Sequence, residues 1–176
     1  ITSPPYPNEK DYSRTTRLES VILGYMNNKV DLRSAKETFL RSNTRNIYKG
    51  DNDEDWIKSF KQVTDLADKI ESRRLELGKT SGFERLYHKV VRNYFGGIAR
   101  HLIELKSILN TGAQLAYVVG DQASYFRIPI RTGKIIAEIA VDIGYELVGI
   151  DLFRTRFSTI TKEQLREEVV LLKWKG

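Results

Sequence analysis

The sequence predicts an α/β fold built on a mixed sheet whose last strand is antiparallel. A short apolar run, residues 115–120, ends in Gly-Asp, which is typical of a buried parallel strand that opens into a loop. Apolar residues at helical spacing precede and follow that run. Two closing strands are expected over residues 145–153 and 168–174, and the segment between them, 154–166, holds no crossover helix. These two strands can therefore pair antiparallel.

The composition limits the chemistry available to the chain. Its 176 residues are 40% hydrophobic, which suits one domain with a core, and 29 Lys or Arg against 23 Asp or Glu give a net charge of +6. This charge favours polyanionic partners. The absence of Cys excludes disulfides, a thiolate nucleophile and Cys-ligated metals. His88 and His101 lie thirteen residues apart, so we expect core-edge or surface histidines and no metal site.

The first residues predict a rigid turn at the end of a strand. Pro4, Pro5 and Pro7 fix the backbone before any supporting element has formed. Ile1 is then interpreted as the last residue of a buried parallel strand whose earlier part lies upstream, so we expect the chain to be a fragment. No apolar run approaches the ~18 residues of a membrane span, and we expect no membrane partner.

The segment that follows is polar, basic and helical. Residues 1–50 hold 9 Lys or Arg and 5 Asp or Glu, so most of the excess charge lies there. The expected helices span residues 13–27, where Leu18, Val21, Ile22 and Tyr25 have helical spacing, and 29–40. A solvated face with loops is the simpler interpretation of this charge.

Longer amphipathic helices are expected over residues 56–77, after an acidic first turn, and 83–109. Gly96-Gly97 within the second helix indicates close approach of a neighbouring backbone, because each glycine costs ~1 kcal/mol relative to Ala in a helix. A further helix should be capped by Thr132 and end at Gly144.

The turn at residues 2–6 is the strongest candidate for chemistry. The carboxyl end of a parallel strand is where open α/β sheets place ligands, and a Pro-Pro pair leaves carbonyl oxygens as a rigid array of acceptors. An exocyclic amino group of a flipped base could donate to the Ser3 hydroxyl and the Pro4 carbonyl while the Tyr6 ring stacked on the base. The alternative is a proline-rich cap over a sheet edge.

These residues resemble the Asp/Asn/Ser-Pro-Pro-Tyr/Trp/Phe motif of the DNA amino-methyltransferases that use S-adenosylmethionine. In that family the motif ends the fourth strand of a Rossmann-like sheet, and the Ser-Pro-Pro-Tyr form resembles the branch that methylates cytosine N(4). The resemblance implies that Ser3, Pro4 and Tyr6 bind the amino group and stack on the base. It also implies that Pro5 shapes the turn and that Thr2 and Ser3 border the cofactor.

The resemblance extends to the last part of the chain. Residues 109–121 are similar to the family's fifth strand and its approach, 135–144 to the next helix, 154–156 to the sixth strand and 165–172 to the closing strand. The family's cofactor-binding Phe-x-Gly-x-Gly element is absent from the sequence. Residues 1–176 are therefore expected to be the catalytic part of a Rossmann-like methyltransferase, with the cofactor-binding half upstream in the same polypeptide or on a partner chain, and the fragment alone is expected to be inactive.

The resemblance implies a cytoplasmic, nucleoid-associated bacterial or archaeal DNA modification enzyme that methylates cytosine N(4), with a restriction endonuclease as a further partner. Adenine N(6) methylation, an inactive DNA-binding module, and an RNA or protein amino acceptor are the alternatives. Residues 8–83 are expected to be a basic helical insertion that contacts double-stranded DNA. Asp121 after the strand is a candidate for a general base. The expected phosphate contacts are Arg14, Arg17, Arg41 and Arg45.

Overall fold

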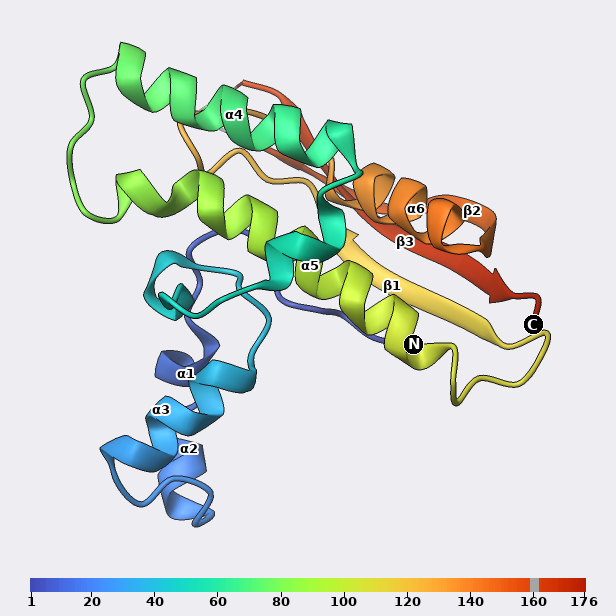
Figure 1. Ribbon diagram of the computed structural model, residues 1–176, viewed down its shortest axis with the longest axis horizontal. Coiled ribbons are helices and arrows are strands. Elements are labelled where there is room, and N and C mark those ends of the chain that lie inside the picture. Colours follow the sequence, from blue (N-terminus) through green and yellow to red (C-terminus); the bar gives the residue numbers. More distant parts are fainter. Residues whose placement is uncertain (159–161) are drawn as a thin grey trace.

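The computed structural model describes residues 1–158 and 162–176 and shows a mixed α/β architecture (Figure 1). This architecture is compatible with part of a Rossmann-like methyltransferase fold, as the sequence predicts. Within the described part of the chain, no helix is long and apolar enough to cross a membrane. The elements, in chain order, are α1 (Tyr12–Thr15), α2 (Arg17–Ile22), α3 (Lys29–Thr38), the 3-10 helices η1 (Thr44–Asn46) and η2 (Asp53–Ile57), α4 (Lys61–Glu76), the 3-10 helix η3 (Glu84–Leu86), α5 (Tyr87–Leu105), β1 (Gln114–Gly120), α6 (Thr132–Ile143), β2 (Tyr145–Phe157) and β3 (Gln164–Trp174).

The sheet has the order β1-β3-β2, and β3 pairs antiparallel with both neighbours. The predicted antiparallel pairing of the last two strands is therefore confirmed. Thr2 adds a parallel bridge to Tyr117 on the free edge of β1. The expectation of a buried strand end at Ile1 is wrong, because this residue is fully exposed. The prediction that residues 115–120 form a parallel strand of a mixed sheet is therefore wrong for the strands described, because β1 pairs antiparallel with β3 and its parallel contact is the single bridge to Thr2.

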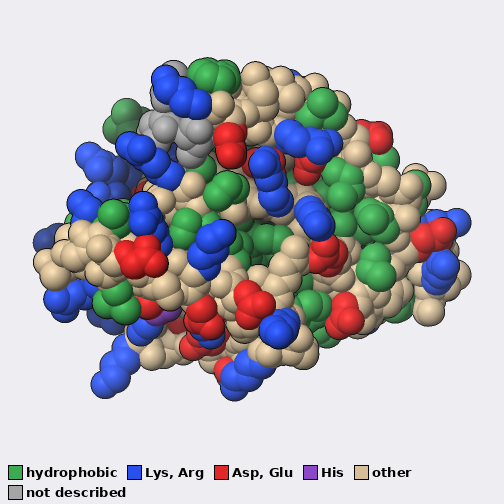
Figure 2. Space-filling view, turned by 90° about the horizontal axis from the view of Figure 1, so that it is seen from above, with side chains coloured by type: hydrophobic (Ala, Val, Ile, Leu, Met, Phe, Trp, Pro, Cys, Tyr) green, Lys and Arg blue, Asp and Glu red, His purple; other side chains and the backbone are tan. Residues whose placement is uncertain are grey.

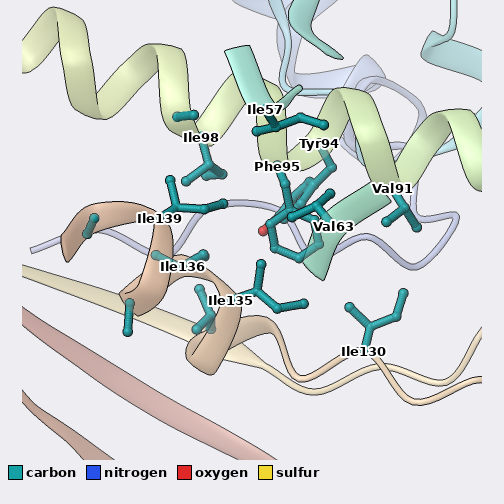
Figure 3. Close-up of a cluster of buried hydrophobic side chains, with 14 of the residues drawn as sticks. Ile57, Val63, Val91, Tyr94, Phe95, Ile98, Ile130, Ile135, Ile136 and Ile139 are labelled. Atoms are coloured by element: carbon teal, nitrogen blue, oxygen red, sulfur yellow. The ribbon is translucent and has the colours of Figure 1, made fainter. Parts of the chain in front are cut away.

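One face of the sheet carries the core. Tyr117 and Val119 of β1 alternate toward this face together with Val170 and Leu172 of β3, as the two-residue period of a strand requires. Helices α5 and α6 cover them, and α4 packs on α5 through Val63, Ala67 and Ile70. Figure 3 shows that side chains of α5, α6, α4 and η2 interdigitate there.

The predicted close approach at Gly96-Gly97 is confirmed. A Cβ atom on Gly96 would lie 1.9 Å from the Asp53 backbone oxygen, and one on Gly97 would lie 2.7 Å from a methyl group of Leu40. The Asp53 carboxylate also pairs with Arg100 of α5 at 2.6 Å. The two glycines thus form the notch into which η2 docks.

Helices α1 to α3 form a lobe that projects from the body (Figure 1). The single helix expected over residues 13–27 is wrong: the chain forms α1 and α2 instead. The Thr15 and Thr16 hydroxyls donate to the Tyr12 carbonyl at 3.0 and 2.9 Å, which competes with helix continuation. The four apolar side chains predicted to share a helical face there are exposed, because the lobe lies outside the core; they are Leu18, Val21, Ile22 and Tyr25.

Several predicted boundaries shift for local reasons. Lys61, not Trp56, begins the fourth helix, because residues 53–57 form η2. Thr132 does not cap α6: Arg131 occupies the cap position, and no side chain caps the helix. Gly144 ends α6 in the left-handed region at φ 108°, as predicted.

The segment 154–166 does not separate the last two strands as expected, since β2 and β3 extend into it. Arg154 and Glu167 form an ion pair across the two strands at 2.5 Å, so charged residues here belong to the ladder. Residues 159–161 of the predicted connection lie outside the described residues.

We expect Gly96→Ala to destabilise the protein by about 1–3 kcal/mol, because the added methyl group must displace the Asp53 backbone. Gly82→Ala is the matched control, since no atom lies within 4 Å of its Cβ position, and it should change stability by less than about 0.5 kcal/mol. Urea unfolding of both variants measures the difference. Equal stabilities would contradict the packing described for η2.

Candidate active site at the Pro-Pro turn

Backbone hydrogen bonds fix the place of the Pro-Pro turn. The Thr2 amide donates to the Ala116 carbonyl at 2.9 Å, and the Val118 amide donates to the Thr2 carbonyl at the same distance. This parallel pairing makes the chain leave the sheet beside the carboxyl end of β1. Ser3 follows in an exposed position, and Pro4 and Pro5 are half-buried. The turn therefore lies at the sheet edge where α/β proteins place ligands.

Tyr6 is half-buried, and its ring lies against the end of β1 and packs at the edge of the core cluster. A Cβ atom on Gly120 would lie 3.0 Å from the Tyr6 ring, so the glycine leaves room for that ring. Burial raises the pKa of the Tyr6 phenol, and nearby Glu167 raises it further, while a hydrogen bond from the Ser3 hydroxyl lowers it. The structure thus brings Ser3 and Tyr6 together, with the phenol neutral at physiological pH.

One pocket borders the turn at Pro5, and a second begins at Asn8, two residues beyond Tyr6. One, of about 370 Å³, is mainly apolar and is lined by Pro5, Tyr12, Phe39 and Leu40, with Asn46 among its polar residues. The other has a volume of about 360 Å³ and includes Asn8 in its lining. The rest of its lining comes from the loop after β1, the end of β2 with the residue that follows it, and the start of β3; these residues are Gln122, Ala123, Ser124, Arg156, Phe157, Ser158 and Leu165.

Glu9 anchors the chain that leaves the turn. Its backbone adopts φ 68°, a left-handed conformation that a non-glycine residue seldom takes. The Glu9 carboxylate accepts hydrogen bonds from the Thr44 amide at 2.9 Å and the Thr44 hydroxyl at 2.6 Å, and Tyr125 donates to it at 3.4 Å. These bonds tie the turn to η1 and to the loop after β1.

Asp121, which follows Gly120 directly, is engaged in an ion pair. Its buried carboxylate pairs with Arg131 at 2.6 Å and lines a pocket that includes Glu168. Glu167 and Glu168 are adjacent in β3 and so point to opposite faces, with Tyr6 on the Glu167 side. Burial raises the pKa of Glu168, and Arg166 opposes that rise. The Asp121 carboxylate is therefore a buried ion-pair partner of Arg131 in the pocket that contains Glu168.

The four arginines expected to contact phosphates differ in exposure. Arg14 and Arg17 lie exposed on the lobe, and Arg45 is exposed with its guanidinium 5.6 Å from the centre of the Phe83 ring. Arg41 is buried: it pairs with Asp51 at 2.8 Å and donates to the Glu37 carbonyl at 3.0 Å. Arg41 holds the end of α3 and is not presented to a nucleic acid in this structure.

The prediction that the histidines lie at the surface or at the edge of the core is confirmed, because His101 is exposed and His88 is half-buried. His101 shares a hydrogen bond of 3.0 Å with the Tyr117 hydroxyl, and His88 lies 3.2 Å from the Glu71 carboxylate. Burial lowers the pKa of both imidazoles. The partners of the two histidines, Tyr117 and Glu71, are not residues of the Pro-Pro turn.

Sequence reasoning missed several residues that build the site. The sequence marks Gly120 only as a strand end, although its missing side chain makes room for Tyr6. Glu9 and Glu167 cannot be identified as site residues from the sequence, because isolated carboxylates occur throughout the chain. Tyr12 lines the pocket beside Pro5 and carries no spacing that could have identified it.

Comparison with known proteins finds similarity to Type II methyltransferases, which supports the methyltransferase family that the Ser-Pro-Pro-Tyr motif predicts. The relatives are the Type II methyltransferases M.AvaI of Nostoc sp. and of Anabaena variabilis. Each is 30% identical over an alignment of 161 positions, which covers 85% of this chain and 31% of the relative. The chain thus spans about a third of the length of these curated relatives. No family model and no solved structure matches.

We expect Glu9→Ala to destabilise the protein by about 1–3 kcal/mol, because the buried Thr44 hydroxyl and amide lose their acceptor. Glu9→Gln should cost less, since the amide oxygen still accepts. Urea denaturation measures the loss of stability in each variant. Hydrogen exchange at the Thr44 amide shows whether its hydrogen bond to residue 9 is lost. A Glu9→Ala variant as stable as Glu19→Ala, a change on the exposed face of α2, would contradict the anchoring role.

Proposed function

We propose that the protein transfers a methyl group from S-adenosylmethionine to the exocyclic amino group of a base flipped out of double-stranded DNA, with cytosine N(4) as the acceptor. This chain would be the catalytic part. The relatives are about three times as long, which leaves room for a cofactor-binding half in the same polypeptide. The similarity to Type II methyltransferases supports the reaction class, and the Ser-Pro-Pro-Tyr form of the motif favours cytosine.

One observation carries the proposal. Ser3, Pro4, Pro5 and Tyr6 form a turn at the carboxyl end of a parallel pairing, with the Tyr6 ring against Gly120. An exposed hydroxyl, a proline carbonyl and an aromatic ring thus occur within four residues. These are the groups needed to hold both hydrogens of an amino group while a ring stacks on the base.

The reaction needs positioning more than acid or base chemistry. The amino nitrogen forms a bond to the methyl carbon as the carbon–sulfur bond breaks, S-adenosylhomocysteine leaves, and the nitrogen then loses a proton to water. The Ser3 hydroxyl and the Pro4 carbonyl would each accept a hydrogen bond from one N–H of the amino group. Holding both hydrogens in this way would direct the nitrogen lone pair toward the methyl group. The Tyr6 phenol, with its raised pKa, stays uncharged and keeps a neutral ring for stacking.

The residues present fit the methyl-donating end of the cofactor. Thr2 and Ser3 are exposed at the end of the parallel pairing, where they can border that end, and the cofactor when bound supplies the electrophilic methyl group. The adenosine half needs residues beyond those of this chain, since the glycine-rich element is absent from the sequence.

Double-stranded DNA is the partner that the charge distribution favours. Arg14, Arg17 and Arg45 are exposed and would contact phosphates, whereas buried Arg41 is left out of the proposed set. The insertion at residues 8–83 would supply these contacts. The enzyme would act in a bacterial or archaeal cytoplasm, together with a restriction endonuclease of the same sequence specificity.

The test is to incubate the complete protein with labelled S-adenosylmethionine and mixed genomic DNA and to identify the labelled nucleoside. We expect N(4)-methylcytosine. Ser3→Ala and Tyr6→Ala should each lower the single-turnover methylation rate by about 100-fold and leave the Kd for DNA within about threefold. Ser107→Ala, which alters a serine two residues after the end of α5, is the matched control and should change neither quantity.

Other labelled products distinguish the alternatives. N(6)-methyladenine would keep the mechanism and overturn the choice of base. Label in RNA or protein alone would overturn the DNA substrate, and binding of cofactor and DNA without any transfer would indicate an inactive binding module. Equal losses of DNA binding and methyl transfer in Ser3→Ala and Tyr6→Ala would overturn the roles given to those residues.

A further inference from the structure

A basic groove of about 580 Å³ lies between the end of α4, the start of α5 and the loop after β1. Its cationic lining residues are Arg73, Lys79 and Arg127, and Tyr87 and Phe126 supply aromatic rings. Figure 2 shows Lys and Arg side chains gathered toward the end of the molecule where α4 ends. None of these cations belongs to the set that the sequence predicted to contact DNA.

The groove adjoins a pocket that reaches the chain just after the Pro-Pro turn. Ala123 and Ser124 line both this groove and the pocket bounded by Asn8, two residues beyond Tyr6. A polymer that occupied the groove would therefore extend toward Ser3 and Tyr6. Continuity of this kind favours a linear polyanion over a small isolated anion.

The groove's cations are available to a phosphate. Arg127 is exposed and has no ion-pair partner among the residues that the structure describes. Lys79 pairs with Glu84 at 3.7 Å, and Arg73 pairs with Glu76 at 2.9 Å, in both cases with partly exposed side chains. Surface pairs of this kind contribute at most about 1 kcal/mol, so a phosphate can replace the carboxylate.

The backbone that presents Arg127 is strained and firmly held. Phe126 and Arg127 have φ of 52° and 62°, and two successive left-handed residues persist only where the surroundings impose them. The buried Tyr125 ring stacks on Tyr87 at 4.6 Å, and the Phe126 ring contacts Tyr87 at 5.2 Å. Tyr125 also donates to Glu9, so the loop is tied to the chain that leaves the Pro-Pro turn.

We propose that this groove binds the sugar-phosphate backbone of the double-stranded DNA that carries the acceptor base, with Arg127 as its central phosphate contact. The inference rests on the proposed function and extends it to a second DNA-contacting surface apart from the lobe. Arg127 supplies the charge, and the ring contacts hold the loop in the conformation that presents it. The groove and the turn would then bind one duplex together.

The test compares Arg127→Gln, Lys79→Gln and the unaltered protein in complete form. Fluorescence anisotropy with a 30-base-pair DNA duplex is recorded over a range of NaCl concentrations. Each variant should bind about tenfold more weakly at 100 mM NaCl, and the slope of log K against log salt should fall by about 0.9 for each phosphate that the variant no longer neutralises. Lys175→Gln, at the opposite end of the sheet, is the control and should bind as the unaltered protein does.

Steady-state methylation gives a second measurement. Arg127→Gln should raise the KM for DNA and leave kcat within about twofold, because the groove positions the duplex and does not touch the acceptor base. Unchanged affinity and salt slope in both variants would overturn the groove. If the two variants bind a 30-base-pair RNA duplex more weakly than the unaltered protein does, but bind the DNA duplex equally well, the groove is specific for RNA and the choice of DNA is overturned.

The two proposals fail in different ways. If the unaltered protein labels no DNA but Arg127→Gln still binds the duplex more weakly, the groove stands and the methylation proposal falls. If the unaltered protein labels DNA and Arg127→Gln binds and methylates normally, the methylation proposal stands and the groove falls.

Discussion

The parallel pairing of Thr2 with β1 is the constraint on which the site depends. Two backbone hydrogen bonds, from the Thr2 amide and to the Thr2 carbonyl, determine where the chain leaves the sheet. The prolines that follow limit the path of the backbone, and Gly120 leaves space for the Tyr6 ring at the end of that path. Without the pairing, the Ser-Pro-Pro-Tyr residues would form a turn with no defined relation to the sheet.

A second set of contacts joins the turn to the rest of the molecule. Glu9 binds Thr44 of η1 and Tyr125 of the loop after β1, and Tyr125 stacks on Tyr87 at the start of α5. The turn, the loop and α5 are therefore mechanically connected through one carboxylate and two rings. The connection explains how strained residues such as Phe126 and Arg127 are kept in place near the site.

The sequence is informative where local patterns agree with tertiary packing. The strand before Gly120, the final antiparallel pair and the notch at Gly96-Gly97 are all predictable, because burial patterns and glycine costs are local signals. The apolar spacing around Leu18 and Val21 is misleading, because those residues lie on a projecting lobe that has no core to face.

The candidate site is predictable only in part for a related reason. Ser3 and Tyr6 are close in sequence, so one motif identifies both, whereas Glu9, Glu167 and Arg127 act through partners far along the chain. Arg41 is predicted to contact phosphates because it lies in a basic segment. In the structure it is buried and holds the end of α3 through its ion pair with Asp51. Charge alone does not distinguish an arginine that faces solvent from one that satisfies backbone carbonyls.

We propose that the Tyr6 ring stacks on the base that is methylated. Photo-crosslinking tests it most directly, with 5-iodocytosine placed at the acceptor position of a DNA duplex that the complete protein methylates. We expect irradiation to attach the base to Tyr6, as identified by mass spectrometry of the peptide. A crosslink confined to the lobe of α1 to α3, with none at Tyr6, would contradict the claim.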